Sequence, residues 1–370
     1  MNIKLGFSDF FSDIRNFLSS QRVLGIDIGT VSVKAIELSR SKSRIKVENY
    51  GIVTTKEYLE RGNEAIQTSS LKLVERDVIQ LLKLLLRDMN PKTRQAAASL
   101  PPFAVFAVPV EIPMMSAEET ARTVPFQAKQ FIPLPLEETA IDWIKIGEFE
   151  NERGGKYQRL LVTAIPKEVI ERYKYIFKRA GLSLSVLEVE SQALVRILGR
   201  SDDPPTLILD IGAASTSVAI MEHGVLKQVA QTDYGGLTLT QAIARNLDVS
   251  AWRAEELKKR KGLVGKDRGV DYLSTALIPF LDVIIQEGMR AKAAFERSFQ
   301  KNVERVTLVG GGANMLGIEN YITAKTGLAA REPRPFSRFT YVSALEPAMP
   351  LLNNELALAS GLAMRFYTQL

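Results

Sequence analysis

The chain has 370 residues, of which 46% are hydrophobic and 24% charged, with a formal net charge of +6, one histidine and no cysteine. A chain of this size can bury a sizeable core and is expected to hold two or more domains. Because it has no cysteine and a single histidine, it cannot use a cysteine nucleophile or a zinc site built from these residues. The basic run at 258–261 is flanked by acidic residues without interleaved aromatics, so we expect a solvated helix end and no nucleic-acid partner.

Residues 3–18 predict a short amphipathic helix, because large apolar residues recur there at spacings of three and four. These residues are Phe7, Phe10, Phe11, Ile14, Phe17 and Leu18. The charges of the segment sum to zero, which is unfavourable for anionic lipid, so we favour docking on the chain itself or on a neighbouring subunit over the alternative, a membrane surface. No membrane-spanning helix is expected, since prolines interrupt the most apolar stretch, 96–115.

The first half of the chain alternates predicted strands and helices. The period-2 apolar pattern at 25–36, broken by glycine and hydroxylated residues, predicts a β-hairpin. Ser116 followed by Glu119 predicts a capped helix start, and Pro125 predicts that this helix is kinked or short. Further strands are predicted at 45–54, 104–110, 139–146 and 160–165, and further helices at 71–88, 166–180 (capped by Gly181) and 190–199.

The second half repeats this plan after residues 202–205, which predict a linker. A second hairpin is predicted at 206–222, and His223 lies in its closing turn, where a histidine is typically solvated and not catalytic. The later elements are a strand up to 231, a long helix at 271–299, a strand at 306–309 and a final helix at 354–367. Because strands and helices alternate, we expect an α/β fold in which two duplicated halves surround a cleft.

Each hairpin carries Asp-Ile-Gly at the end of an apolar strand, beginning at Asp27 in the first copy and at Asp210 in the second. The Gly, Ala, Ser and Thr residues that follow leave backbone N–H groups uncovered, and these can cradle phosphate oxygens. An acid in such a position is costly unless it is paired or bound to a cation, and it can hold the hydrated Mg²⁺ that accompanies a nucleotide. The repeated pattern therefore predicts two clamps on one nucleotide.

Five elements in this order resemble the actin-like ATPase superfamily, which includes actin, a class of heat-shock chaperones, sugar kinases and FtsA. They are the two hairpins, Gly235-Gly236, 254–258 and 308–314. The resemblance implies a duplicated actin-like (ribonuclease H-like) two-domain fold that binds ATP and Mg²⁺, with Asp27 and Asp210 at the metal. It implies nucleotide-binding roles for Gly29, Thr30, Ser32, Lys34, Gly212, Ser215, Gly235, Gly236, Glu255, Lys258, Gly311, Gly312 and Asn314.

The resemblance also bears on catalysis. Glu190 falls on the connecting helix that in relatives can orient the attacking water. Ser217 stands where many relatives have an aspartate near the magnesium waters, so we expect at most a slow ATPase. A carbohydrate kinase of the same superfamily is the enzyme alternative, but it would need a positioned acceptor hydroxyl and a base, and no motif for these is evident.

Residues 116–143 and 161–167 resemble the PilM family, the cytoplasmic actin-like proteins of type IV pilus assembly. The resemblance implies an FtsA-type inserted subdomain at 96–182, a first half at 23–95 and 183–203, and a second half at 204–370, after a segment at 1–22.

This second resemblance implies a cytoplasmic scaffold that lies at the inner-membrane face through its partner, the cytoplasmic N-terminal segment of a PilN-like membrane protein. That segment is expected to bind beside the inserted subdomain, and a homo-oligomer is left open. An FtsA-like cell-division protein is the main alternative. However, FtsA-like proteins have a C-terminal membrane-targeting helix, and residues 364–370 do not resemble one.

Overall fold

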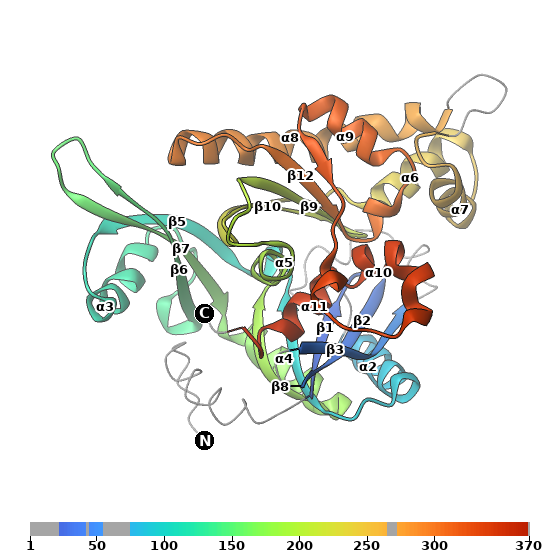
Figure 1. The fold of residues 1–370 in the computed structure, drawn as a ribbon, viewed down its shortest axis with the longest axis horizontal. Helices are drawn as coiled ribbons and strands as arrows, with labels where there is room; N and C mark the ends of the chain where they lie inside the picture. The colour runs from blue at the N-terminus through green and yellow to red at the C-terminus, as the bar shows by residue number, and fades with distance from the viewer. Residues whose placement is uncertain (1–21, 42–43, 55–74, 265–271, 369–370) are drawn as a thin grey trace.

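The computed structural model describes residues 22–41, 44–54, 75–264 and 272–368. Two five-stranded sheets with the same topology form its centre (Figure 1). The first has the order β3-β2-β1-β4-β8. Its strands are β1 (Arg22–Ile28), β2 (Ser32–Ser41), β3 (Arg44–Thr54), β4 (Gln95–Leu100) and β8 (Ser183–Val189). β2 runs antiparallel to β1, whereas β4 is parallel to it.

The second sheet repeats this arrangement in the order β11-β10-β9-β12-β13. Its strands are β9 (Thr206–Ile211), β10 (Thr216–Glu222), β11 (Val225–Thr232), β12 (Arg305–Val309) and β13 (Ala329–Arg331). The two hairpins also share a register, because Asp27 is paired with Lys34 in the first and Asp210 with Ser217 in the second. The structure confirms the predicted duplication. Lys34 and Ser217 occupy equivalent positions in the two hairpins.

Alternate residues of the inner strands face two different cores, as the period of a strand requires. Leu24 and Ile26 of β1 pack in a core with α2 (Glu75–Met89) and α4 (Lys167–Ala180). Leu207 and Leu209 of β9 pack in an equivalent core with the helices of the second half. Those helices are α6 (Gly236–Leu247), α7 (Ala251–Lys261), α8 (Tyr272–Phe299) and α9 (Ile318–Thr326).

The opposite faces of the two sheets share a third core, which contains α5 (Glu190–Leu198) and α11 (Ala357–Met364). Both helices lie between the sheets in Figure 1. Glycine permits their close approach, since a Cβ on Gly25 of β1 would lie 1.9 Å from the Ala359 carbonyl oxygen, and one on Gly361 would lie 2.1 Å from that of Ala193. The predicted second half, 204–370, is therefore too long, because α11 packs on the first sheet.

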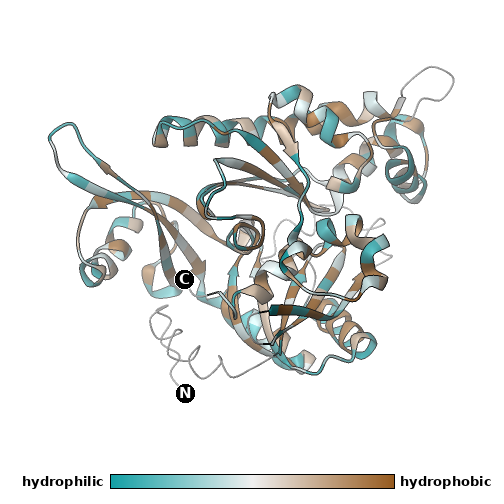
Figure 2. Cartoon of the chain, viewed as in Figure 1, coloured by the Kyte–Doolittle hydropathy of each residue, from teal (hydrophilic) through white to brown (hydrophobic). Residues whose placement is uncertain are grey.

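A separate three-stranded sheet forms the inserted subdomain, in the order β5-β7-β6, with α3 beside it. Its elements are β5 (Phe106–Pro113), α3 (Ala117–Ala128), β6 (Thr139–Glu150) and β7 (Lys156–Pro166). Ser116 and Glu119 form the predicted capping box, and the helix continues through Pro125 without being broken there. The tip of the β6–β7 hairpin projects from the molecule and is hydrophilic (Figure 2).

The predicted bounds of this subdomain, 96–182, are too wide. β4 belongs to the first sheet, and α4 buries Tyr173 and Phe177 in the core of the first half. Gly181 ends α4 in the left-handed conformation, as predicted. The separate unit thus corresponds to 106–166.

Two further predictions need correction. Residues 202–205 are not a loose linker, because Asp203 is buried and its carboxylate is bound by Arg305 and Arg331. The predicted final helix is divided into α10 (Met349–Glu355) and α11, which meet at Leu356. The short 3₁₀ segments are η3 (Pro102–Ala104), η4 (Leu136–Glu138), η5 (Gly311–Asn314), η6 (Pro335–Arg338) and η7 (Ser343–Ala348).

The amphipathic helix predicted at 3–18 lies outside the described residues, as does the start of the helix predicted at 71–88. None of the helices in the described ranges combines the length and the apolarity that a membrane crossing requires.

Candidate functional site

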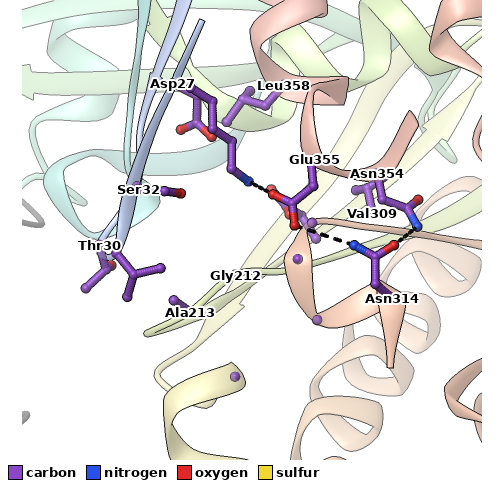
Figure 3. Close-up of a pocket in the computed structure, with 18 of the residues that line it drawn as sticks. Asp27, Thr30, Ser32, Gly212, Ala213, Val309, Asn314, Asn354, Glu355 and Leu358 are labelled. Carbon is purple, nitrogen blue, oxygen red and sulfur yellow. Dashed lines mark hydrogen bonds and ion pairs between the residues drawn. The ribbon is translucent and has the colours of Figure 1, made fainter. Parts of the chain in front are cut away.

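A cleft of about 570 Å³ lies between the two hairpins and is lined from both halves of the molecule. Figure 3 shows Thr30 and Ser32 on one side, Gly212 and Ala213 below, and Asn314 on the opposite side. The turns at the ends of the hairpins are closed alike. The Gly29 N–H donates to the Ser32 carbonyl at 2.9 Å, and the Gly212 N–H donates to that of Ser215 at 3.0 Å.

Glycine is required in both turns. A Cβ on Gly29 would lie 2.9 Å from the Ser32 carbonyl oxygen, and a Cβ on Gly212 would lie 2.9 Å from that of Ser215. These tight turns bring the chain close to the cleft with little side chain in the way, which is the arrangement that lets backbone N–H groups approach an anion.

The carboxylate of Asp27 is the most unusual group of the cleft. The residue is 8% exposed, and its Oδ1 is buried with no hydrogen-bond partner. A buried acceptor without a partner is costly. Asp210 reaches the cleft from the second hairpin. A Cβ on Gly310, which has a φ of 84°, would lie only 2.4 Å from the Oδ1 of Asp210, so glycine leaves room for this carboxylate.

The donor set suits a hydrated cation better than a fully protein-coordinated one. Across the described ranges, no three His, Asp or Glu side chains gather closely enough to hold a metal ion together. Two carboxylates leave most positions of an octahedral Mg²⁺ to water and phosphate oxygens, which is how Mg²⁺ is usually bound beside nucleotides. The unpartnered Oδ1 of Asp27 fits that arrangement.

Lys34 of β2 forms an ion pair across the cleft, with its Nζ 2.5 Å from Oε2 of Glu355. Burial favours the neutral amine, but the charges of Glu355 and Asp27 outweigh it and raise the pKa of Lys34 above its usual 10.5. Lys34 is thus a buried cation in the cleft. Its partner Glu355 was not among the residues expected from the sequence.

Glu190 lies at the first position of α5 and is 3% exposed. The Oγ of Ser217 donates to its Oε2 at 3.4 Å. Both residues line the cleft, so the carboxylate expected to orient water and the serine expected in place of an acid are neighbours.

On the far side of the cleft, α6 and α7 are joined through a buried lysine. The Nζ of Lys258 lies 2.7 Å from Oε2 of Glu255, and it donates to the Gly236 carbonyl and to Thr240 Oγ1 at 2.7 Å each. Burial lowers the pKa of Lys258, and the negative charge of Glu255 offsets this only in part. Burial would raise the pKa of Glu255, but the ion pair with Lys258 outweighs it and lowers this pKa.

The glycine-rich segment after β12 closes the site. Gly311, Gly312 and Asn314 form η5, and Asn314 accepts a hydrogen bond from the Nδ2 of Asn354 at 2.7 Å. The Oδ1 of Asn354 is a second buried acceptor of the cleft that has no partner. A polar group of a ligand can satisfy it.

Of the residues expected at a nucleotide, all but one line this cleft. The exception is Gly235, which lies beneath the second turn. A Cβ there would come within 2.7 Å of the Ala213 carbonyl oxygen and 2.8 Å of the Ser215 nitrogen, so Gly235 supports that turn from below.

Comparison with known proteins identifies the family and the fold. The sequence model described as type IV pilus assembly protein PilM matches residues 25–367. The chain belongs to the PilM family. This membership selects pilus assembly over the two alternatives, an FtsA-like division protein and a carbohydrate kinase.

Solved structures share the actin-like two-domain fold of this PilM family member. The PilM–PilN type IV pilus biogenesis complex matches with a TM-score of 0.78 and 24% identity over 94% of this chain and 99% of that one. The ethanolamine utilization protein EutJ from Carboxydothermus hydrogenoformans matches with a TM-score of 0.55 and 16% identity, covering 95% and 98%. MreB 5 of Spiroplasma citri bound to AMPPNP has a TM-score of 0.51 and 14% identity, covering 93% and 95%.

Three residues of the PilM-family cleft whose contacts are described above were missed from the sequence. Glu355 and Asn354 begin an otherwise apolar stretch of the final predicted helix, and this change in polarity was the available signal. Gly310 belongs to a run of three glycines of which only the last two were expected at the site. Its positive φ and its closeness to Asp210 appear only in the folded chain.

Proposed function

We propose that the chain binds ATP and Mg²⁺ in the cleft and acts as a nucleotide-responsive scaffold in the inner-membrane complex of type IV pilus assembly. The observation that carries the proposal is the unpartnered Oδ1 of Asp27 in a cleft that Asp210 and the two glycine turns also line. Membership of the PilM family supports the pilus role, and the AMPPNP named with the similarly folded MreB 5 supports the choice of ligand.

In this proposal each group of the cleft has a defined role. Asp27 and Asp210 would hold a hydrated Mg²⁺, which would supply neutralising charge for the phosphates. Backbone N–H groups at Thr30–Ser32 and Ala213–Ser215 bind phosphate oxygens, while the Gly29 and Gly212 N–H groups close the turns. Lys34 contributes a buried cation. Residues Glu255, Lys258, Gly311, Gly312 and Asn314 surround the adenosine.

Hydrolysis is expected to be slow. Glu190 can orient a water molecule, but its Oε2 also accepts from Ser217, and Ser217 supplies no second carboxylate. ATP therefore acts chiefly as a ligand that favours one closure of the two halves. This would be contradicted by a steady-state ATP hydrolysis rate of about 1 per second without partners, which is the low end for ordinary enzymes.

The proposed partner is the cytoplasmic N-terminal segment of a PilN-like membrane protein, which would bring the chain to the cytoplasmic face of the inner membrane. The complex named PilM–PilN supports this choice. The inserted subdomain offers exposed apolar side chains, with Phe126 75% and Phe131 49% exposed. Its outer strands β5 and β6 are the edges of the three-stranded sheet, and a peptide can add to such an edge as a further strand.

Calorimetric titration with ATP, with and without Mg²⁺, tests the nucleotide site. Asp27→Asn and Asp210→Asn are expected to weaken Mg²⁺-dependent binding by about tenfold or more, on the scale of 1.4 kcal/mol for one lost ionic contact. Asp88→Asn, at an exposed aspartate of α2, is the control. Wild-type affinity in both cleft variants would refute the site.

Pull-down with a synthetic peptide of the PilN-like N-terminus tests the partner. Phe126→Glu with Phe131→Glu is expected to abolish capture while ATP binding persists. Tyr175→Glu, which alters a side chain of α4 that is 51% exposed, should leave capture unchanged. Intact capture in the double variant would refute the location.

A further inference from the structure

A second cavity, of about 420 Å³, lies away from the nucleotide cleft. It is formed between residues 197–200, at the end of α5, and residues 331–338, which lead from β13 through η6. It shares no lining residue with the nucleotide cleft. Thr307 of β12 also lines it, and the glycine run of the cleft follows the far end of that strand.

The lining of this cavity is strongly basic. It contains four arginines, Arg200, Arg331, Arg334 and Arg338, and one acid, Glu332, which leaves an excess of three positive charges. Glu332 is committed to Arg334, whose Nη2 lies 3.0 Å from its Oε2. Within the described part of the chain, neither Arg200 nor Arg338 forms an ion pair with a carboxylate.

A buried aspartate behind the cavity holds part of this cluster in place. The Oδ1 of Asp203 accepts from Arg305 and Arg331 at 2.8 Å each, and its Oδ2 accepts the backbone N–H of Arg200 at 2.9 Å. Burial would raise the pKa of Asp203, but Arg331 and the Arg200 N–H outweigh it and lower this pKa. Both oxygens of Asp203 are therefore occupied, and the cavity is pre-organised without being neutralised.

The charge of Arg338 is not compensated by an ion pair in the part of the chain that the structure describes. Its Nη2 donates to the Gly199 carbonyl, a neutral acceptor that brings no negative charge. Burial and the neighbouring charge of Arg200 lower its pKa, which Asp203 offsets only in part. Like charges held together around a cavity repel one another, and an anion that enters between them relieves the repulsion.

We propose that this cavity binds a soluble, phosphate-bearing small molecule. Guanidinium groups bind phosphate oxygens in bidentate pairs, and several of them can bind one phosphate. A phosphate carries more negative charge than a single carboxylate does, so it matches a cluster of arginines better. The volume lies within the range of small-ligand sites, roughly 300–1,000 Å³. The site is independent of the nucleotide cleft, and it is formed where α5, which lies between the two halves, meets the second half.

Binding of inorganic pyrophosphate to the full chain tests the proposal, measured by equilibrium dialysis. Arg200→Gln with Arg334→Gln removes two guanidinium groups from exposed side chains, and we expect this double variant to lose one pyrophosphate site or to bind there at least tenfold more weakly. Arg122→Gln is the matched control, because Arg122 is 77% exposed and paired with Glu118, much as Arg334 is 72% exposed and paired with Glu332. Its pyrophosphate binding should equal that of the wild type.

Each other outcome overturns the proposal. Unchanged pyrophosphate binding in the double variant would show that the anion binds in the nucleotide cleft or binds non-specifically. An equal loss of Mg²⁺-ATP affinity in a variant with an unchanged melting curve would contradict the independence of the two sites. If the double variant lost sedimentation with phosphatidylglycerol vesicles but kept pyrophosphate, the arginines would belong to a lipid-facing surface instead.

Discussion

Lys34 of β2 and Glu355 at the end of α10 face each other across the cleft, with Nζ 2.5 Å from Oε2. Glu355 also accepts from Asn314 Nδ2 at 3.5 Å, and Figure 3 shows it between the two sides of the pocket. One carboxylate thus joins the lysine of the first hairpin to the glycine-rich segment after β12. A phosphate that approaches Lys34 has to compete with this carboxylate.

Glu355→Gln is therefore expected to release Lys34 for the phosphates and to raise Mg²⁺-ATP affinity several-fold. Without nucleotide, the same change should lower the free energy of unfolding by about 1–3 kcal/mol, because it removes a charge-assisted hydrogen bond. Calorimetry and urea unfolding measure the two effects. Glu118→Gln, at an exposed ion pair of a kind that contributes little, is the control. Weaker ATP binding would indicate that Glu355 itself contacts the nucleotide.

Gly310→Ala should be more harmful than the same substitution at another left-handed glycine. At Gly310 the φ is 84° and the new Cβ would lie 2.4 Å from Asp210 Oδ1, whereas at Gly181 the φ is 82° and nothing lies within 4 Å. Gly181→Ala is expected to cost about 1 kcal/mol from backbone strain alone. Gly310→Ala should cost more in thermal unfolding and also displace Asp210, which would weaken Mg²⁺-ATP binding. Equal losses of stability would contradict this account.

Asp142 of β6 should make stability depend on pH. Burial raises its pKa to about 6 from 3.8, although the Trp143 N–H and Arg365 oppose this. The folded chain therefore holds this proton more tightly than the unfolded chain, so the contribution of Asp142 is present at low pH and is lost as the pH rises through about 6. Asp142→Asn is expected to raise the free energy of unfolding at pH 7.5 by about 1–2 kcal/mol.

The effect of Asp142→Asn should shrink as the pH falls towards 3.8, because residue 142 of the folded chain is then neutral in the wild type as well as in the variant. Denaturant unfolding at several pH values measures it, and Asp88→Asn, on exposed α2 surface, should show no such trend. A gain that grows at low pH would have the wrong sign.

Arg159 of β7 should hold the inserted subdomain against the second half. Its guanidinium lies 4.4 Å from the ring centre of Phe149 and 5.1 Å from that of Phe299, and it donates to the Ser298 carbonyl at the end of α8. Arg159→Lys keeps the charge but loses the planar fork that allows stacking and hydrogen bonding together. We expect a loss of about 1 kcal/mol, with faster amide hydrogen exchange in the β6–β7 hairpin and the last turn of α8. Unchanged exchange there would show that the contact does not restrain the subdomain.

Local patterns predicted those features that depend on neighbouring residues in the chain. The hairpins, the capping box at Ser116 and the left-handed Gly181 follow from strand periodicity, side-chain capping and the lack of a Cβ, and each occurs in the structure. The boundaries of the halves did not follow, because β4, α4 and α11 join the first half through contacts between residues distant in sequence. Asp203 was wrongly assigned to a linker for the same reason, since its partners Arg305 and Arg331 come 102 and 128 residues later.

The sequence by itself determined the duplicated plan, because a repeated Asp-Ile-Gly hairpin can be recognised from order and spacing alone. It also predicted most of the glycines and acids that line the cleft, although it missed Gly310 and Glu355 and wrongly included Gly235. Only the tertiary structure decided how those acids and cations are paired. The Lys34–Glu355 ion pair, the unpartnered Asp27 oxygen and the cavity lined by four arginines arise where separate strands and helices converge. Electrostatic interactions there depend on distance and burial, which a linear pattern does not contain.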